Sequence, residues 1–116
     1  MSLARPPEPA QLAPVFAALG DPTRWNLVFR LSGSGPLPIV QLAADSGMTR
    51  QAITKHLHVL EAVGLARSRR RGREQLWELT PEQIRNMQRN LDLIARSWDD
   101  AMDRLAAMVE EPTETP

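Results

Sequence analysis

The chain has 116 residues, with 14 Lys and Arg balanced by 14 Asp and Glu, and it has no cysteine. This length suits one domain with its own core. The lack of cysteine excludes a disulfide, a thiolate metal site and a cysteine nucleophile. No apolar run approaches the roughly 20 residues that span a bilayer. Because the start also lacks a signal-peptide pattern, we expect a cytoplasmic protein.

Charge is distributed unevenly along this neutral chain. Residues 1–48 have no net charge, whereas residues 49–80 carry seven Lys and Arg against three acidic residues, a net of +4. Residues 81–116 carry four Arg against eight acidic residues, a net of −4. Local sign governs association more than the sum does, so the middle of the chain is the candidate surface for an anionic partner.

The N-terminal third predicts an arm followed by two helices. Residues 1–9 contain three prolines, which predict a flexible arm because proline removes helix donors. A first helix is expected at about residues 10–19, and a second follows as far as about Ser32. Between them, Gly20-Asp21-Pro22 is typical of one helix ending and another beginning, with Asp21 as the cap and Pro22 in the first turn.

The central part of the chain predicts three consecutive elements. A short helix over 39–46 ends at Gly47, which can adopt the left-handed conformation of a helix terminus. A second helix over 49–63 begins at Thr49, a good N-cap residue. A β-hairpin over 65–79 follows. Helix, tight turn, helix and hairpin in this order are typical of a winged helix-turn-helix domain, which lays one helix in the DNA major groove.

The helix over 49–63 has two different faces. Apolar side chains recur at Ile53, Leu57 and Leu60, on one side of a helix. An ordinary helical hairpin with a solvated outer face is the alternative, but the arginine-rich hairpin that follows favours DNA recognition. The candidate DNA-reading residues, capped by Thr49, lie on the polar side: Arg50, Gln51, Thr54, Lys55 and His58.

The hairpin over 65–79 is the candidate wing. Gly72 at its tip can supply the positive φ of a tight turn. On the return strand we expect Trp77 and Leu79 to face the domain and Glu78 to face water. Five arginines fall between Arg67 and Arg73, and the residues expected to contact DNA phosphates are Arg69, Arg70, Arg71 and Arg73.

A long helix over 81–110 follows the hairpin, and an acidic, flexible tail is expected at 111–116. Apolar residues recur along the helix at alternating steps of three and four, a heptad pattern. Part of this stripe is expected to pack on the first helix, and the rest on a second copy of the chain. The proposed dimerisation residues are Ile84, Met87, Leu91, Ile94, Trp98 and Leu105.

Three segments together resemble the ArsR-type (ArsR/SmtB) winged-helix repressors. They are the sequence FAALGDPTR at 16–24, MTRQAITKHL at 48–57 and VLEAVGL at 59–65. The resemblance implies a mainly helical domain with a small β-hairpin over 10–110 and a long C-terminal dimerisation helix. It also implies a dimeric transcriptional repressor that leaves its operator when an effector binds.

The chain departs from this family at the positions of its metal ligands. Where the best-known members have Cys-x-Cys before the recognition helix, this chain has Pro38 and Val40, and the last helix has no histidine. His56 and His58, two residues apart on a helix, point in different directions and cannot share an ion. We therefore expect no metal site, no cofactor and a packing role for His56, and any effector would be a non-metal small molecule of unknown identity.

The functional prediction is a homodimeric, sequence-specific regulator of double-stranded DNA that binds a pseudo-palindromic operator, most simply as a repressor. The alternative is a winged-helix module for protein–protein interaction, which the arginine cluster disfavours. An enzyme is not expected, because the sequence offers no nucleophile–base pair, phosphate loop or metal-ligand set.

Overall fold

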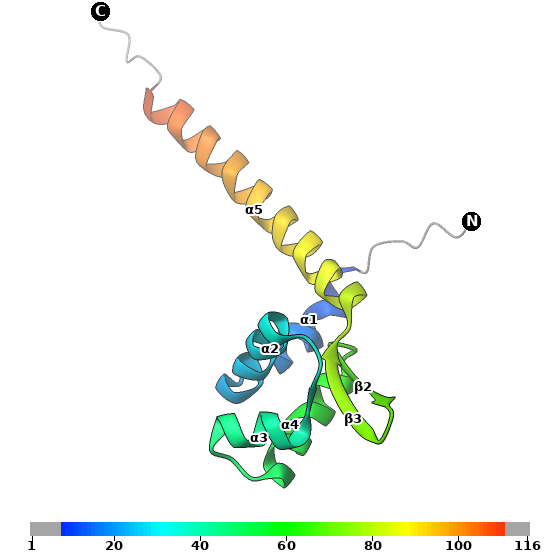
Figure 1. The fold of residues 1–116 in the computed structure, drawn as a ribbon. Helices are drawn as coiled ribbons and strands as arrows, with labels where there is room; N and C mark the ends of the chain where they lie inside the picture. The colour runs from blue at the N-terminus through cyan, green and yellow to red at the C-terminus, as the bar shows by residue number, and fades with distance from the viewer. Residues whose placement is uncertain (1–7, 111–116) are drawn as a thin grey trace, which may run out of the picture. The chain divides into compact units, whose positions relative to one another are not determined.

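The computed structural model describes residues 8–110, which divide into two compact units between Asn86 and Met87 (Figure 1). The prediction of a mainly helical winged helix-turn-helix fold is confirmed. The elements in chain order are α1 (Pro9–Ala18), α2 (Pro22–Ser34), β1 (Leu37–Pro38), α3 (Ile39–Ser46), α4 (Arg50–Ala62), β2 (Ala66–Arg71), β3 (Glu74–Leu79) and α5 (Pro81–Glu110).

Helices α1 and α2 begin where local chemistry allows. Pro9, which we expected in the N-terminal arm, is the first residue of α1, and the helix continues through Pro14. The Glu8 N–H donates to the Gln11 side-chain oxygen at 2.8 Å, which occupies a backbone group that the first turn leaves free. In α2 the expected cap is confirmed, because the Asp21 carboxylate accepts the Arg24 N–H at 3.1 Å. The rest of the expected arm (1–7) and the expected tail (111–116) lie outside the described residues.

The core of the first unit joins α1 to α4 and the hairpin. On α2 the buried side chains are Leu27 and Leu31, whereas Trp25 is 55% and Phe29 74% exposed. The apolar residues of α2 therefore do not share one face, because Trp25 and Phe29 point away from the core. Fully buried large side chains come from three helices, α1, α3 and α4, and from the loop before β2: Leu12, Leu42, Ile53, Leu57, Leu60 and Leu65.

The sheet is antiparallel, with β3 between β1 and β2. The hairpin has a regular register in which Arg67 is opposite Glu78 and Arg71 is opposite Glu74. Strand β1 was not predicted, since it is two residues long and contains Pro38, a residue that is tolerated at a sheet edge. Within the first unit, the hairpin lies beside α4 (Figure 1).

Helix α5 has 30 residues and changes character along its length. Ile84 is half-buried and Met87 is buried. No helix among residues 8–110 is apolar over enough of its length to cross a membrane. From residue 91 onward the large apolar side chains are at least half exposed: Leu91, Leu93, Ile94, Trp98, Met102, Leu105, Met108 and Val109.

Candidate nucleic-acid interface

The turn between α3 and α4 sets the start of the candidate recognition helix. Gly47 ends α3 in the left-handed conformation, with φ 71°. The Ser46 hydroxyl donates to the Ala43 carbonyl at 2.9 Å and accepts the Met48 N–H at 3.0 Å. The Thr49 hydroxyl then accepts the Ala52 N–H at 3.1 Å, so the predicted N-cap is confirmed. The first turn of α4 is thus held by local hydrogen bonds on both sides of Gly47.

Helix α4 separates a packed face from an exposed polar face. Ile53, Leu57 and Leu60 are fully buried. Thr54 is half-buried, and its hydroxyl donates to the Arg50 carbonyl at 2.7 Å, which leaves the oxygen free to accept. The remaining predicted reading residues, which the helix places on the same broad face, are exposed: Arg50, Gln51, Lys55 and His58.

His58 differs from the other candidate reading residues because protein groups already contact it. Its Nδ1 lies 3.1 Å from Glu61 Oε1, one turn further along α4. Its ring also meets the Trp77 ring of β3 edge-on, with centroids 5.8 Å apart. His58 therefore links α4 to the wing, and its assignment as a base-reading residue stays a prediction.

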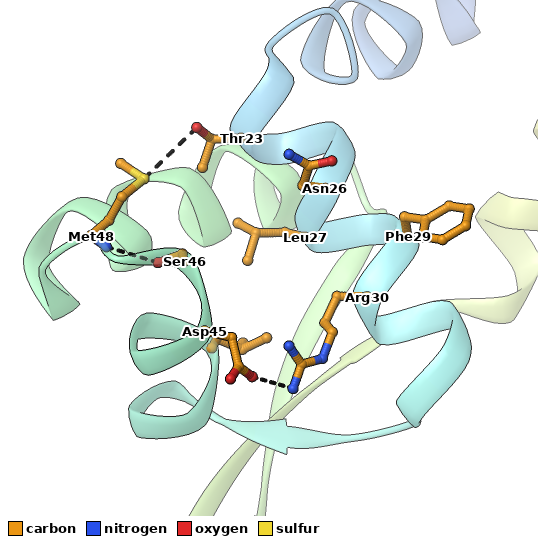
Figure 2. A pocket seen from close by; sticks show the side chains of 9 residues that line it. Thr23, Asn26, Leu27, Phe29, Arg30, Asp45, Ser46 and Met48 are labelled. Atoms are coloured by element: carbon orange, nitrogen blue, oxygen red, sulfur yellow. Dashed lines mark hydrogen bonds and ion pairs between the residues drawn. The ribbon is translucent and has the colours of Figure 1, made fainter.

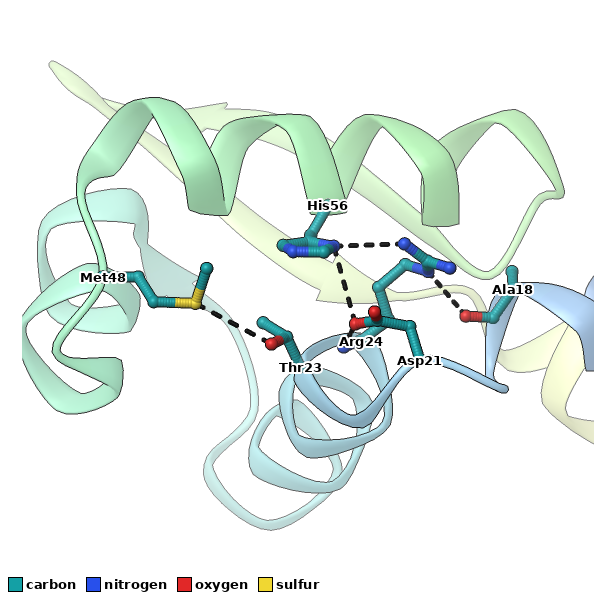
Figure 3. Close-up of polar contacts among 6 residues, drawn as sticks. All are labelled: Ala18, Asp21, Thr23, Arg24, Met48 and His56. Carbon is teal, nitrogen blue, oxygen red and sulfur yellow. Dashed lines mark hydrogen bonds and ion pairs between the residues drawn. The ribbon is translucent and has the colours of Figure 1, made fainter.

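A polar cluster, Asp21, Arg24 and His56, supports α4 from α2 (Figure 3). Arg24 Nε donates to the Ala18 carbonyl at 2.6 Å, and its NH1 lies 3.1 Å from His56 Nδ1. Since arginine only donates, a hydrogen bond here requires His56 Nδ1 to be the acceptor. Asp21 Oδ2 lies 3.8 Å from the same nitrogen. His56 is half-buried in this cluster, which agrees with a hydrogen-bonded packing role.

The Asp21 carboxylate is stabilised in its charged form. The pKa of Asp21 is held below its ordinary value of 3.8, chiefly because the carboxylate accepts the Arg24 backbone N–H. The nearby Arg24 guanidinium lowers this pKa further, while partial desolvation opposes both effects. Asp21 is therefore charged at neutral pH where it supports α4.

The structure of the wing contradicts the expectation that Glu78 faces water. Glu78 does not face water: its side chain is only 12% exposed, and it pairs with Arg67 Nε at 2.7 Å and Arg69 Nε at 3.0 Å. The register explains this, because Arg67 lies directly opposite Glu78 and Arg69 is the next residue on that face. Trp77 is buried and Leu79 half-buried, as predicted.

The tip of the wing carries the arginines whose charge is uncompensated. Gly72 has φ 64°, as the predicted tight turn requires. Within residues 8–110, Arg70, Arg71 and Arg73 make no ion pair and are exposed. Of the four arginines predicted to contact phosphates, these three are free to do so, whereas Arg69 already pairs with Glu78.

Sequence reasoning missed two contributors to this surface. Arg24 connects α2 to α4, and only its position beside the Asp21 cap suggested any role. Glu78 could have been found by counting back from Gly72, since hairpin pairing then places it opposite Arg67. In the part of the chain that the structure describes, no three His, Cys, Asp or Glu residues are grouped to hold a metal ion. The expected independence of metal stays a prediction.

A capped, polar helix beside a basic hairpin defines a winged helix-turn-helix DNA-binding domain. The family model "Bacterial regulatory protein, arsR family" matches residues 21–68. The HTH-type transcriptional regulator Rv2034 of Mycobacterium tuberculosis is 33% identical over 110 residues, which cover 95% of this chain and 94% of that protein. The chain belongs to the arsR family of bacterial transcriptional regulators, as its sequence motifs indicated, and it is not an enzyme.

Solved structures agree with this assignment. An ArsR-like transcriptional regulator from Rhodococcus sp. RHA1 superposes with a TM-score of 0.71 at 38% identity, over 91% of this chain and 96% of that one. The fold also matches a domain described as a homodimeric winged helix-turn-helix DNA-binding domain, Mb0332 of Mycobacterium bovis. That match has a TM-score of 0.59 at 21% identity and covers 92% of this chain and 89% of the other.

Proposed function

We propose that this regulator is a homodimeric, cytoplasmic repressor that binds a pseudo-palindromic operator and leaves it when a non-metal small molecule binds. The observation that carries the DNA-binding part is the exposed polar face of α4 next to the uncompensated arginines of the wing tip. Two such surfaces, held about 34 Å apart, would enter successive major grooves on one side of the duplex.

The apolar stripe of α5 supports the homodimer. Leu91, Ile94 and Leu105 are 51%, 52% and 55% exposed, and Trp98 is 66% exposed. Met102 and Val109 widen the same stripe, because they follow Trp98 and Leu105 by one helical turn. Contiguous apolar surface of this extent on a soluble protein marks an interaction site. A second copy with the same heptad pattern is the partner that it fits, and Mb0332, the fold match at 21% identity, is described as homodimeric.

The two elements of the DNA surface would have different tasks. Arg50 and Gln51 lie in the first turn of α4, where side chains reach deepest into a major groove. An arginine can contact guanine through two hydrogen bonds, and a glutamine can contact adenine in the same way. The wing tip, with three free guanidinium groups, suits phosphates, which fix register without reading sequence.

DNA binding can be tested by fluorescence anisotropy with the promoter of the protein's own gene and a scrambled duplex. At a salt concentration of about 150 mM, we expect the promoter to bind at least roughly 1,000-fold more tightly. Added Zn²⁺ should leave this affinity unchanged. Equal affinity for both duplexes would contradict sequence-specific binding and favour the protein-interaction alternative.

The dimer can be tested by light scattering on the full chain at tens of micromolar. We expect twice the mass of the 116-residue chain. Replacing Leu91 and Ile94 together with Glu should give monomers that lose operator affinity, because each would carry only one recognition helix. The exposed Gln88→Glu variant on the same helix is the matched control and should remain dimeric. A monomeric wild type at this concentration would refute the dimer.

A further inference from the structure

A cavity of about 420 Å³ lies between α2 and α3, beside the turn that leads into α4 (Figure 2). Its floor is apolar, formed by the buried side chains of Leu27 and Leu42. Met48 closes one end, while the Phe29 ring points away from the other lining side chains. The volume falls within the range of roughly 300–1,000 Å³ that is usual for small-molecule sites.

The α2 wall of this cavity is rich in hydrogen-bond donors. Thr23, Asn26 and Arg30 recur at steps of three and four, and therefore lie on one side of the helix. The Thr23 hydroxyl donates to the Met48 sulfur at 3.8 Å, and a thioether is a weak acceptor. The Asn26 side chain is exposed and makes no hydrogen bond to another group of residues 8–110. The Asn26 amide and the weakly paired Thr23 hydroxyl are therefore open to an acceptor in the cavity.

The opposite wall limits the charge that a ligand can carry. Asp45 of α3 forms an ion pair with Arg30 across the cavity (Figure 2). Asp45 also accepts weakly from Gln41, at 3.5 Å. A guanidinium has five N–H donors, and in the described structure Arg30 offers one terminal nitrogen to Asp45. A single carboxylate can therefore share Arg30, whereas a more highly charged anion would be repelled by Asp45.

We propose that this cavity binds small organic monocarboxylates with a compact apolar body. The carboxylate accepts hydrogen bonds from Arg30, Asn26 and Thr23, and the apolar body contacts Leu27 and Leu42. A ligand at this place displaces Met48, whose neighbour Thr49 caps α4. A role of the cavity as an effector site rests on the proposed DNA-binding function. Binding of a carboxylate in the cavity does not depend on that function.

The test is a ¹H–¹⁵N NMR titration of the full chain without DNA. The probes are phenylacetate and its neutral match phenylacetamide, for which the size of the ligand predicts a dissociation constant on the order of 1 mM. Phenylacetate should shift amide signals of residues 23–30 and 42–49, and phenylacetamide should bind at least several-fold more weakly. Arg30→Met should abolish the phenylacetate shifts, whereas Arg85→Met, on the exposed face of α5, should keep them.

Asp45→Asn distinguishes a binding site from a structural ion pair. Without its competitor, Arg30 should bind phenylacetate roughly two- to fivefold more tightly, the gain that an exposed ion pair allows. Weaker binding by Asp45→Asn, equal shifts with phenylacetamide, or shifts confined to the wing and α5 would overturn the proposal. Because no DNA is present, such a failure leaves the proposed function intact. Conversely, a failure to bind promoter DNA leaves this titration unaffected.

Discussion

Helix α4 and the wing both present positive charge, but the protein holds them differently. Helix α4 is fixed from within by Ile53, Leu57 and Leu60, which are fully buried, and its polar face is left open. The wing is also anchored in the core, by Leu76 and Trp77, but on its outer face Glu78 engages two of its five arginines. Under the proposed function, the fixed polar face of α4 reads base edges, and the free arginines of the wing tip contact phosphates, which set register without reading sequence.

The largest effect is expected when the reading face is changed. Gln51→Ala should cost about 1–3 kcal/mol per half-site on the operator and little on random DNA, because it removes a hydrogen-bonding group from a base edge. Two half-sites double the cost in a dimer. Anisotropy titrations of both duplexes measure it, with exposed Gln88→Ala on α5 as the matched control. An equal weakening on operator and random DNA would mean that α4 does not read sequence.

Changing the wing should give a more even effect. Arg71→Ala should weaken operator and random DNA alike, and should lower the slope of log affinity against log salt by about one unit for each phosphate that the variant no longer binds. Arg69→Ala should change the slope less, since Glu78 already holds that guanidinium 3.0 Å away. Salt titrations of the two variants make the comparison. Identical slopes for both would show that the ion pair opens on DNA.

These two sets of residues also show what could be read from the sequence. The caps at Asp21 and Thr49, and the glycine turns at Gly47 and Gly72, depend on neighbouring residues and were predicted correctly. The buried side of α4 followed from helical periodicity, for the same reason. Local chemistry therefore specified where α2 and α4 begin and which face of α4 is exposed to solvent.

Features that depend on distant residues were not predicted. Trp25 and Phe29 are as apolar as Leu27, yet only the packing of α2 decides that they are exposed. The contact of His58 with Trp77 joins two elements 19 positions apart in the chain. The cavity between α2 and α3 is likewise lined by two helices, and Arg30 and Asp45 pair across it from positions 15 residues apart. Such contacts join distant segments, so the pattern within one segment carries little information about them.

The support of α4 by Asp21 should depend on pH. Because the folded-state pKa of Asp21 lies below its ordinary value of 3.8, its charge stabilises the fold above about pH 4. This stability is lost as pH falls through the folded-state pKa. Asp21→Asn retains a capping oxygen and should therefore lose less stability than the wild type between about pH 5 and about pH 2. Urea unfolding across this range tests it, and parallel curves for the two proteins would rule out a contribution from Asp21.

The smallest expected effect is a gain, and it tests directly whether Glu78 restrains the wing. Glu78→Gln keeps the shape of the side chain but removes its charge, so Arg67 and Arg69 become free to contact phosphates. The salt dependence of binding to random DNA should steepen by about one unit or less, because a freed arginine contacts a phosphate only part of the time.

Glu74→Gln is the matched control for this gain. It removes the same charge from the same face of the hairpin, opposite Arg71, but within residues 8–110 Glu74 makes no ion pair. Both variants change the long-range field equally, and only Glu78→Gln releases arginines. A steeper slope in Glu78→Gln alone therefore assigns the restraint to the ion pairs. An equal change in both variants would mean that net charge, and not the ion pairs of Glu78, sets how the wing binds DNA. The wing and α4 would then differ only in the part of the DNA that each contacts.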